Sequence, residues 1–155
     1  MKYTSIGASV FALFNVMTGA VHAGDDRGAI RDLLLHMFDR PEARLSVAPI
    51  SIESGVAVAG WIQGDLGGRA LLREANGTWQ IILCGGDALT DAAALQQLGL
   101  DAETARKLAL SVKTSEAQLP PAIAQQLSSF EGLVMMDQHI AKPQTDTAHR
   151  EHDRQ

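Results

Sequence analysis

The side chains in this sequence that are best suited to soft-metal chemistry are one cysteine, a methionine pair and a nearby histidine. Cys84, the only cysteine, lies in the segment Leu83-Cys84-Gly85-Gly86-Asp87. Met135 and Met136 are adjacent, and His139 follows three residues later. Thiolate, thioether and imidazole groups are ligands that suit copper(I). The pattern predicts a copper(I) site formed by Met135, Met136 and His139, with Cys84 as a further candidate ligand.

Two interpretations of Cys84 are open from the sequence. A single cysteine cannot form an internal disulfide, and it can simply be a small buried hydrophobic residue at the end of a strand. Alternatively, the helix expected to start near Asp87 lowers the pKa of the thiol, because a helix N-terminus favours the thiolate. The second interpretation predicts a native pKa below the reference value of about 8.5.

The histidines are poorly placed for catalysis. His36 is one turn before Arg40, on the polar side of a predicted helix, and we interpret it as a surface residue. His149 and His152 would bring their rings together if their segment became helical, but a solvated tail is the simpler interpretation. No Gly-x-Ser-x-Gly, His-Glu-x-x-His or phosphate-binding Gly-Lys motif is present. We therefore do not expect an enzyme.

The N-terminus has the pattern of a cleaved secretory signal. Lys2 is followed by an apolar run from Ile6 to Val16, and Val21-His22-Ala23 offers small residues for cleavage after Ala23. The alternative is a membrane anchor, but the apolar run is short for a bilayer span. The full chain has a formal net charge of −5 and no basic stripe, which argues against nucleic acid as a partner. We expect a periplasmic protein with no membrane insertion after cleavage.

The segment after the signal reads as one helix followed by a sheet. Apolar residues from Ile30 to Phe38 recur at helical spacing, and Arg40-Pro41 ends the pattern. Between Leu45 and Cys84 the spacing changes to two, which predicts four strands, with a break at Pro49 in the first. Asn76-Gly77 lies between the last two strands and is a strong hairpin signal, because both residues tolerate positive φ. We therefore predict an antiparallel meander.

The remainder of the domain has a helical pattern. The predicted elements are a helix over 92–98 capped by Asp87 or Thr90, a helix from Asp101 to about Gln118, a helix from Pro120-Pro121 through Phe130, and a short strand over 132–136. Residues 24–136 should form one α+β domain, with the N-terminal helix packed on a four-stranded antiparallel meander sheet and a helical C-terminal part. A cystatin-like or nuclear-transport-factor-like arrangement fits this order. Residues 137–155 are predicted to be a disordered polar tail.

Two charged residues lie near the expected turn between the second and third strands. Asp65 and Arg69 flank a pair of glycines in this loop. The simple interpretation is an ion pair between them. The alternative is a contact surface for a partner, because loops on a rigid sheet often carry binding residues.

Several blocks of this sequence resemble bacterial copper uptake system-associated proteins. These blocks are AGWIQGDLGGRALL at 59–72, Trp79, LCGGDAL at 83–89 and Phe130-Glu131-Gly132. The resemblance covers about residues 25–136. It implies a supporting role in copper acquisition, beside a periplasmic copper chaperone or a copper-import receptor. Those proteins are expected to end in a denser histidine cluster, whereas His139 stands alone here.

The sequence thus favours a periplasmic accessory protein of copper uptake, which binds copper(I) weakly or binds a copper chaperone or receptor. The alternative is a metal-free interaction module in the periplasm, acting as an adaptor or inhibitor. A thiol-dependent enzyme is a third and weaker interpretation.

Overall fold

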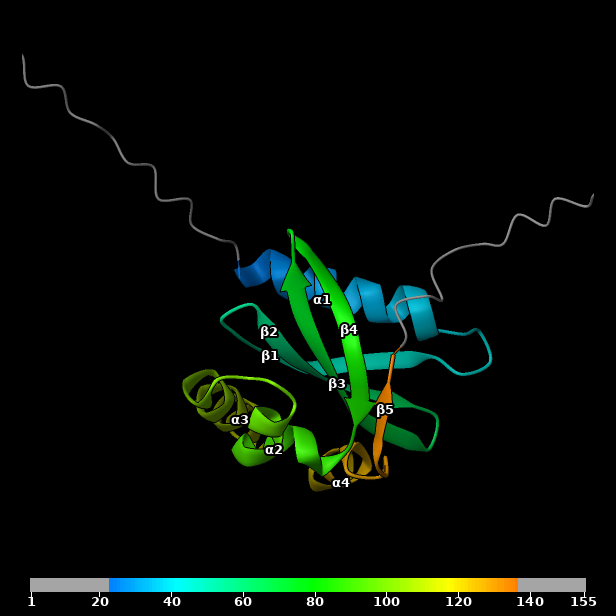
Figure 1. The fold of residues 1–155 in the computed structure, drawn as a ribbon. Coiled ribbons are helices and arrows are strands. Elements are labelled where there is room, and N and C mark those ends of the chain that lie inside the picture. Colours follow the sequence, from blue (N-terminus) through cyan, green and yellow to red (C-terminus); the bar gives the residue numbers. More distant parts are fainter. Residues whose placement is uncertain (1–22, 137–155) are drawn as a thin grey trace, which may run out of the picture.

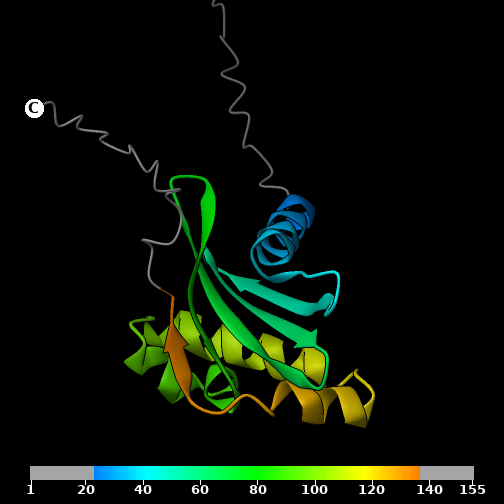
Figure 2. The same cartoon turned by 90° about the vertical axis from the view of Figure 1, so that its right-hand side faces the viewer.

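The computed structural model describes residues 23–136, which form an antiparallel sheet with helices on both of its faces (Figures 1 and 2). The predictions for the signal segment before residue 23 and for the tail after residue 136 lie outside this range. Among the described residues, no helix is both long enough and apolar enough to cross a membrane.

The first helix, α1 (Ala23–Phe38), packs on one face of the sheet, as the sequence predicts. Ile30 and Leu34 are completely or almost completely buried against the strands. Polar contacts anchor the same helix, since Asp26 accepts a hydrogen bond of 3.2 Å from the indole Nε1 of Trp79. The helix ends at Phe38, shortly before Pro41, which is disfavoured in a helix interior.

The predicted meander is confirmed. Strands β1 (Leu45–Glu53), β2 (Val56–Gln63), β3 (Leu66–Ala75) and β4 (Thr78–Gly85) pair antiparallel in chain order. Asn76 and Gly77 both have positive φ, of 53° and 75°, as the hairpin prediction requires. The register of β1 shifts between Val47 and Ile50, which confirms the predicted break at Pro49.

The sheet has five strands, so the prediction of a four-stranded sheet was one strand short. Strand β5 (Leu133–Met135) pairs antiparallel with β4, and Cys84 lies opposite Val134. The short strand expected near residues 132–136 is therefore present. It is one of the two edge strands, and Figure 1 shows it beside β4.

Both faces of the sheet are buried, because alternate strand residues enter two separate cores. Val58, Leu71 and Leu83 lie opposite one another and face the C-terminal helices. Ala59, Ala70 and Cys84 form the neighbouring cross-strand row and face the α1 side. This double covering explains why the middle of β3 is buried continuously rather than at every second residue.

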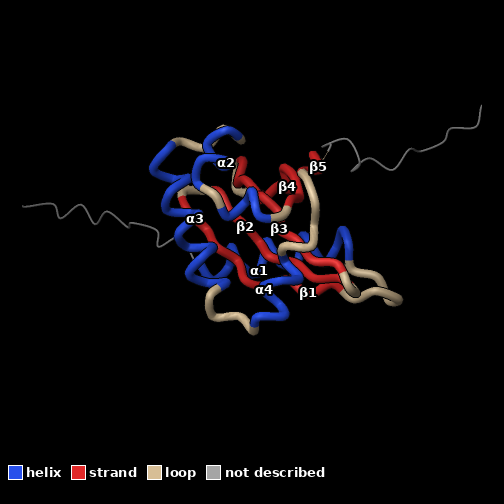
Figure 3. The backbone as a smooth tube through the Cα atoms, turned by 90° about the horizontal axis from the view of Figure 1, so that it is seen from below, coloured by secondary structure: helices blue, strands red, loops and turns tan. Residues whose placement is uncertain are grey.

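The C-terminal layer contains a 3₁₀ turn, η1 (Asp87–Thr90), and helices α2 (Ala92–Gln97), α3 (Ala102–Glu116) and α4 (Pro121–Leu127). Figure 3 shows α3 and α4 over the strands, and Figure 2 shows these helices on the side of the sheet opposite α1. Asp101 caps α3 as predicted. The capping prediction for α2 was wrong: Asp91 is the cap, because residues 87–90 are already used in the 3₁₀ turn. Phe130 lies beyond the end of α4 rather than within it.

Candidate functional site

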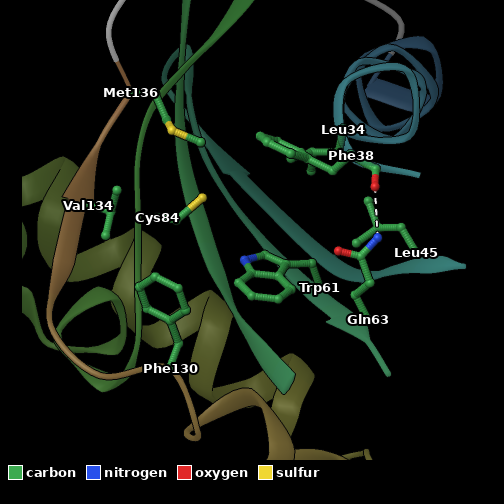
Figure 4. A pocket seen from close by; sticks show the side chains of 9 residues that line it. All are labelled: Leu34, Phe38, Leu45, Trp61, Gln63, Cys84, Phe130, Val134 and Met136. Atoms are coloured by element: carbon green, nitrogen blue, oxygen red, sulfur yellow. Dashed lines mark hydrogen bonds between the residues drawn. The ribbon is translucent and has the colours of Figure 1, made fainter. Parts of the chain in front are cut away.

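A pocket of about 290 Å³ opens on the α1 face of the sheet (Figure 4). Its walls come from the end of α1, the strands β1, β2 and β4, and the segment that runs from Phe130 through β5. The nine lining residues carry no formal charge, and most are apolar: Leu34, Phe38, Leu45, Trp61, Gln63, Cys84, Phe130, Val134 and Met136.

Small side chains next to the pocket explain why the space is not filled. Ala59, Ala70 and Cys84 lie opposite one another on β2, β3 and β4, and Val134 of β5 extends the row. Alanine and cysteine have short side chains, so this row of residues leaves space above the sheet. The larger Trp61 is two residues along β2 from Ala59 and therefore rises from the same face.

Cys84 is buried in the strand rather than placed at a helix start. Its residue is 8% exposed, and burial raises the pKa of the thiol from 9.0 to about 11. The prediction of a lowered pKa is wrong because Cys84 pairs with Ala70 and Val134 in the sheet, and only the short 3₁₀ turn follows it. The buried interpretation is confirmed. Figure 4 nevertheless shows the sulfur directed toward the pocket.

The two methionines are separated by the alternation of β5. Met135 is 64% exposed and does not line the pocket. Met136 follows at once, packs against the α1-side core and lines the pocket, where its backbone N–H donates to the carbonyl of Ile82 at 2.9 Å. The structure therefore brings Met136 to the same pocket as Cys84 and leaves Met135 outside it (Figure 4). The third predicted ligand, His139, lies outside the described residues.

Trp61 is the pocket residue whose polar group sequence reasoning missed. Its indole Nε1 is buried and has no hydrogen-bond partner among residues 23–136, and Figure 4 shows this nitrogen on the pocket side. The ring meets Phe130 edge to face, with centroids 5.6 Å apart. The Trp61 ring packs against the α1-side core, but its nitrogen faces the pocket.

Gln63 supplies the other polar group of the lining. Its Nε2 donates to the carbonyls of Phe38 and Ala43 at 2.7 and 2.8 Å, which ties the end of β2 to the turn after α1. The carboxamide oxygen is left on the pocket side (Figure 4). Trp61 and Gln63 thus present one donor and one acceptor to an otherwise apolar space.

Arg69 has a structural place that differs from both sequence interpretations. Its residue is 2% exposed, and its Nε and Nη2 each donate to the Glu116 carboxylate at 2.7 Å. Nη1 donates to Asp87 at 3.2 Å and to the carbonyl of Leu127 at 3.1 Å. The predicted ion pair with Asp65 is therefore wrong, and the buried guanidinium is not available to a partner. Asp65 is exposed in the β2–β3 turn.

The electrostatics of Arg69 favour its charged form. Burial lowers its pKa, but the hydrogen bond and charge of Glu116, together with Asp87, outweigh burial and raise the pKa overall. One side chain thereby joins β3 to α3, to η1 and to the end of α4. The chain that continues from α4 forms the Phe130 wall of the pocket.

Two glycines allow that wall to approach the sheet. A Cβ at Gly86 would clash with the carbonyl oxygen of Phe130. A Cβ at Gly68 would lie 2.8 Å from the Trp61 ring and 2.9 Å from the Phe130 Cβ, closer than such atoms pack. Glycine at these positions is thus required for the edge-to-face contact of Trp61 and Phe130.

No group of three or more His, Cys, Asp or Glu side chains that could hold a metal ion occurs within residues 23–136. The soft donors that share a site in this range are the sulfurs of Cys84 and Met136. Searches against protein-family models, curated proteins and solved structures gave no match to this chain.

Proposed function

We propose that this protein is a periplasmic accessory protein of copper uptake that binds copper(I) weakly at the pocket. The observation that carries the proposal is that Cys84, on β4, and Met136, directly after β5, both line one accessible pocket. A thiolate and a thioether are soft ligands suited to copper(I), and copper(I) needs few of them. The apolar lining would shield the bound ion from water.

His139 is the third ligand in this proposal. Met136 is at the pocket, and three residues of extended chain span roughly 10 Å, which is enough for an imidazole to reach the sulfurs. Met135 is a poor ligand for the same ion because it lies on the other side of β5. In this proposal Cys84 is a principal copper(I) ligand, whereas the sequence analysis made it an additional one. Met135, which the sequence analysis predicted as a ligand, is not part of the site.

The state of the thiol explains why binding would be weak. The ligand form of cysteine is the thiolate, so copper(I) must displace a proton from Cys84. Its pKa is raised from 9.0 to about 11, and each unit is a factor of ten. At neutral pH, Cys84 should therefore bind copper(I) more weakly than an exposed thiol with the same other ligands. Such an affinity is suited to handing the ion to a copper chaperone or receptor.

The proposed compartment rests on the N-terminal signal pattern. Cleavage after Ala23 would leave Gly24 as the first residue and keep nearly all of α1. Intact-mass measurement of protein recovered from the periplasm should give the mass of residues 24–155. An uncleaved mass in the membrane fraction would contradict this part of the proposal.

A copper(I) competition titration of residues 24–155 tests the site. Cys84→Ala and Met136→Leu should each weaken binding at least tenfold, because each removes one of very few ligands. Met135→Leu is the matched control, since it removes the neighbouring thioether on the opposite side of β5, and it should bind like the parent protein. Truncation after Met136 tests His139 and should weaken binding while the domain remains folded.

Two outcomes would contradict the copper site. One is equal loss for Met135→Leu and Met136→Leu, which would mean that the pocket does not select the ligand. The other is unchanged binding in Cys84→Ala. Far-UV circular dichroism of each variant separates loss of binding from loss of fold.

The alternative function is a metal-free interaction module, and the exposed edge of β5 favours it. Leu133, Val134 and Met135 are large apolar residues that are all more than one third exposed. An edge strand can add a strand from a partner through main-chain hydrogen bonds. If the parent protein does not bind copper(I), the copper variants are uninformative. Binding of a purified copper chaperone should then be measured with the parent protein and with Met135→Lys.

A further inference from the structure

We infer that the pocket binds a small uncharged organic molecule that accepts a hydrogen bond from the indole Nε1 of Trp61. This inference goes beyond the proposed function and requires no copper. It rests on the pocket volume, on the charge of its lining and on the unpaired donor of Trp61.

The pocket volume sets the size of the molecule. The space is about 290 Å³. An apolar cavity of roughly 150 Å³ holds one benzene molecule. The pocket therefore suits a compound of about two fused rings, and it is small for a nucleotide or a long acyl chain.

The lining excludes an ionised ligand. None of the lining side chains carries a formal charge. Moving an ionised carboxylate or ammonium out of water without a partner is strongly unfavourable. The bound molecule should therefore be neutral, and most of its surface should be apolar.

The buried donor of Trp61 specifies one polar group on the molecule. An indole N–H can donate but cannot accept. It has no partner within residues 23–136, whereas the other tryptophan, Trp79, donates to Asp26 at 3.2 Å. An unsatisfied buried donor is unfavourable, so a ligand acceptor placed here gains from pairing with it. A ketone, ester or similar neutral carbonyl group supplies such an acceptor.

The geometry holds the donor in place. Phe130 packs edge to face against Trp61, and the absence of a side chain at Gly68 leaves room for the ring. Because the indole is positioned before any ligand enters, little side-chain ordering opposes binding. Val134, on the edge strand, is half exposed and lines the same pocket, so it can be used to fill the space.

The test uses two probes that differ by one carbonyl: α-tetralone and tetralin. Each is titrated into metal-free protein containing a chelator, and the two indole N–H resonances are followed by NMR. With tetralone, the Trp61 resonance should move downfield while that of Trp79 stays in place, which makes Trp79 an internal reference. Tetralin should bind without the downfield shift.

Variants assign the hydrogen bond and the location. In Trp61→Phe, the affinity of tetralone relative to tetralin should fall about 3- to 10-fold, the net value of one hydrogen bond. Val134→Trp should abolish binding of both probes by filling the pocket. Met135→Trp, on the other side of the same strand, should bind both probes normally.

Several results would overturn the inference. They are no binding of either probe, an unchanged ratio in Trp61→Phe, and equal loss in Val134→Trp and Met135→Trp. One variant distinguishes this inference from the copper proposal. Cys84→Ala should lose copper(I) binding and keep tetralone binding, because the indole remains in place.

Discussion

Raising the pH should destabilise this protein through Cys84. The thiol is neutral when protonated, and burial raises its pKa from 9.0 to about 11 because the charged thiolate loses its solvation. The folded state therefore holds this proton more tightly than the unfolded chain. The resulting contribution to stability is complete below pH 9 and is lost as the pH rises from 9 toward 11.

The size of the effect follows from the two pKa values. At pH 10, an unfolded chain with a pKa of 9.0 has largely lost the proton, whereas the folded protein with a pKa of about 11 has largely kept it. The linkage relation then gives a loss on the order of 1 kcal/mol in the free energy of unfolding between pH 8 and pH 10. The loss approaches roughly 3 kcal/mol above pH 11, where both states are ionised.

Urea unfolding of the parent protein and of Cys84→Ala, with a reductant present, measures this contribution. Other groups also titrate in this range, so the informative quantity is the difference between the two proteins at each pH. Between pH 8 and pH 10, the parent protein should lose on the order of 1 kcal/mol more stability than Cys84→Ala does. A difference that is constant with pH would refute the argument, because it would mean that the native thiol is solvated like an unfolded one.

Two further predictions concern the framework around the pocket, and both are measured by urea unfolding. Arg69→Ala should cost about 3–5 kcal/mol, because it leaves the poorly exposed Glu116 carboxylate without its partner; Lys107→Ala, which removes exposed ion pairs, should cost less than about 1 kcal/mol. Equal costs would contradict the buried network. Gly86→Ala should destabilise by about 1–3 kcal/mol through its clash with Phe130, whereas Gly28→Ala, in open space on α1, should be neutral or slightly stabilising. A neutral Gly86→Ala would show that the Phe130 segment does not lie as described.

The parts of the fold that sequence predicted are those with local causes. The hairpin at Asn76-Gly77 follows from two residues that tolerate positive φ, and the start of α3 follows from the cap at Asp101. The packing of α1 follows from the spacing of Ile30 and Leu34. Each of these signals lies within a few residues of the structure that it specifies.

The errors concern contacts between distant parts of the chain. Arg69 looked like a turn residue because Asp65 is close in sequence, but its carboxylate partner, Glu116, lies 47 positions away. Strand β5 has three residues and is held mainly by its pairing with β4, so its own pattern is weak. The raised pKa of Cys84 likewise depends on burial by both neighbouring strands, which no local motif reports.

The candidate site could be predicted only in part. Alternation along a strand already indicated that Met135 and Met136 point in opposite directions. Which of them joins Cys84 depends on the register of β5 against β4, where Cys84 lies opposite Val134. No sequence pattern indicates that the Trp61 indole lacks a partner within residues 23–136, because a tryptophan in a strand is usually interpreted as a core residue.

The pocket explains why glycines occur in the conspicuous blocks of this sequence. Trp61 and Gly68 belong to the block at 59–72, Cys84 and Gly86 to the block at 83–89, and Phe130 to a third. In the folded chain Gly68 makes room for the Trp61 ring, and Gly86 makes room for the Phe130 backbone. The three blocks therefore meet around one pocket, although they are dispersed over about 70 residues. Close packing of the pocket walls best explains these glycines.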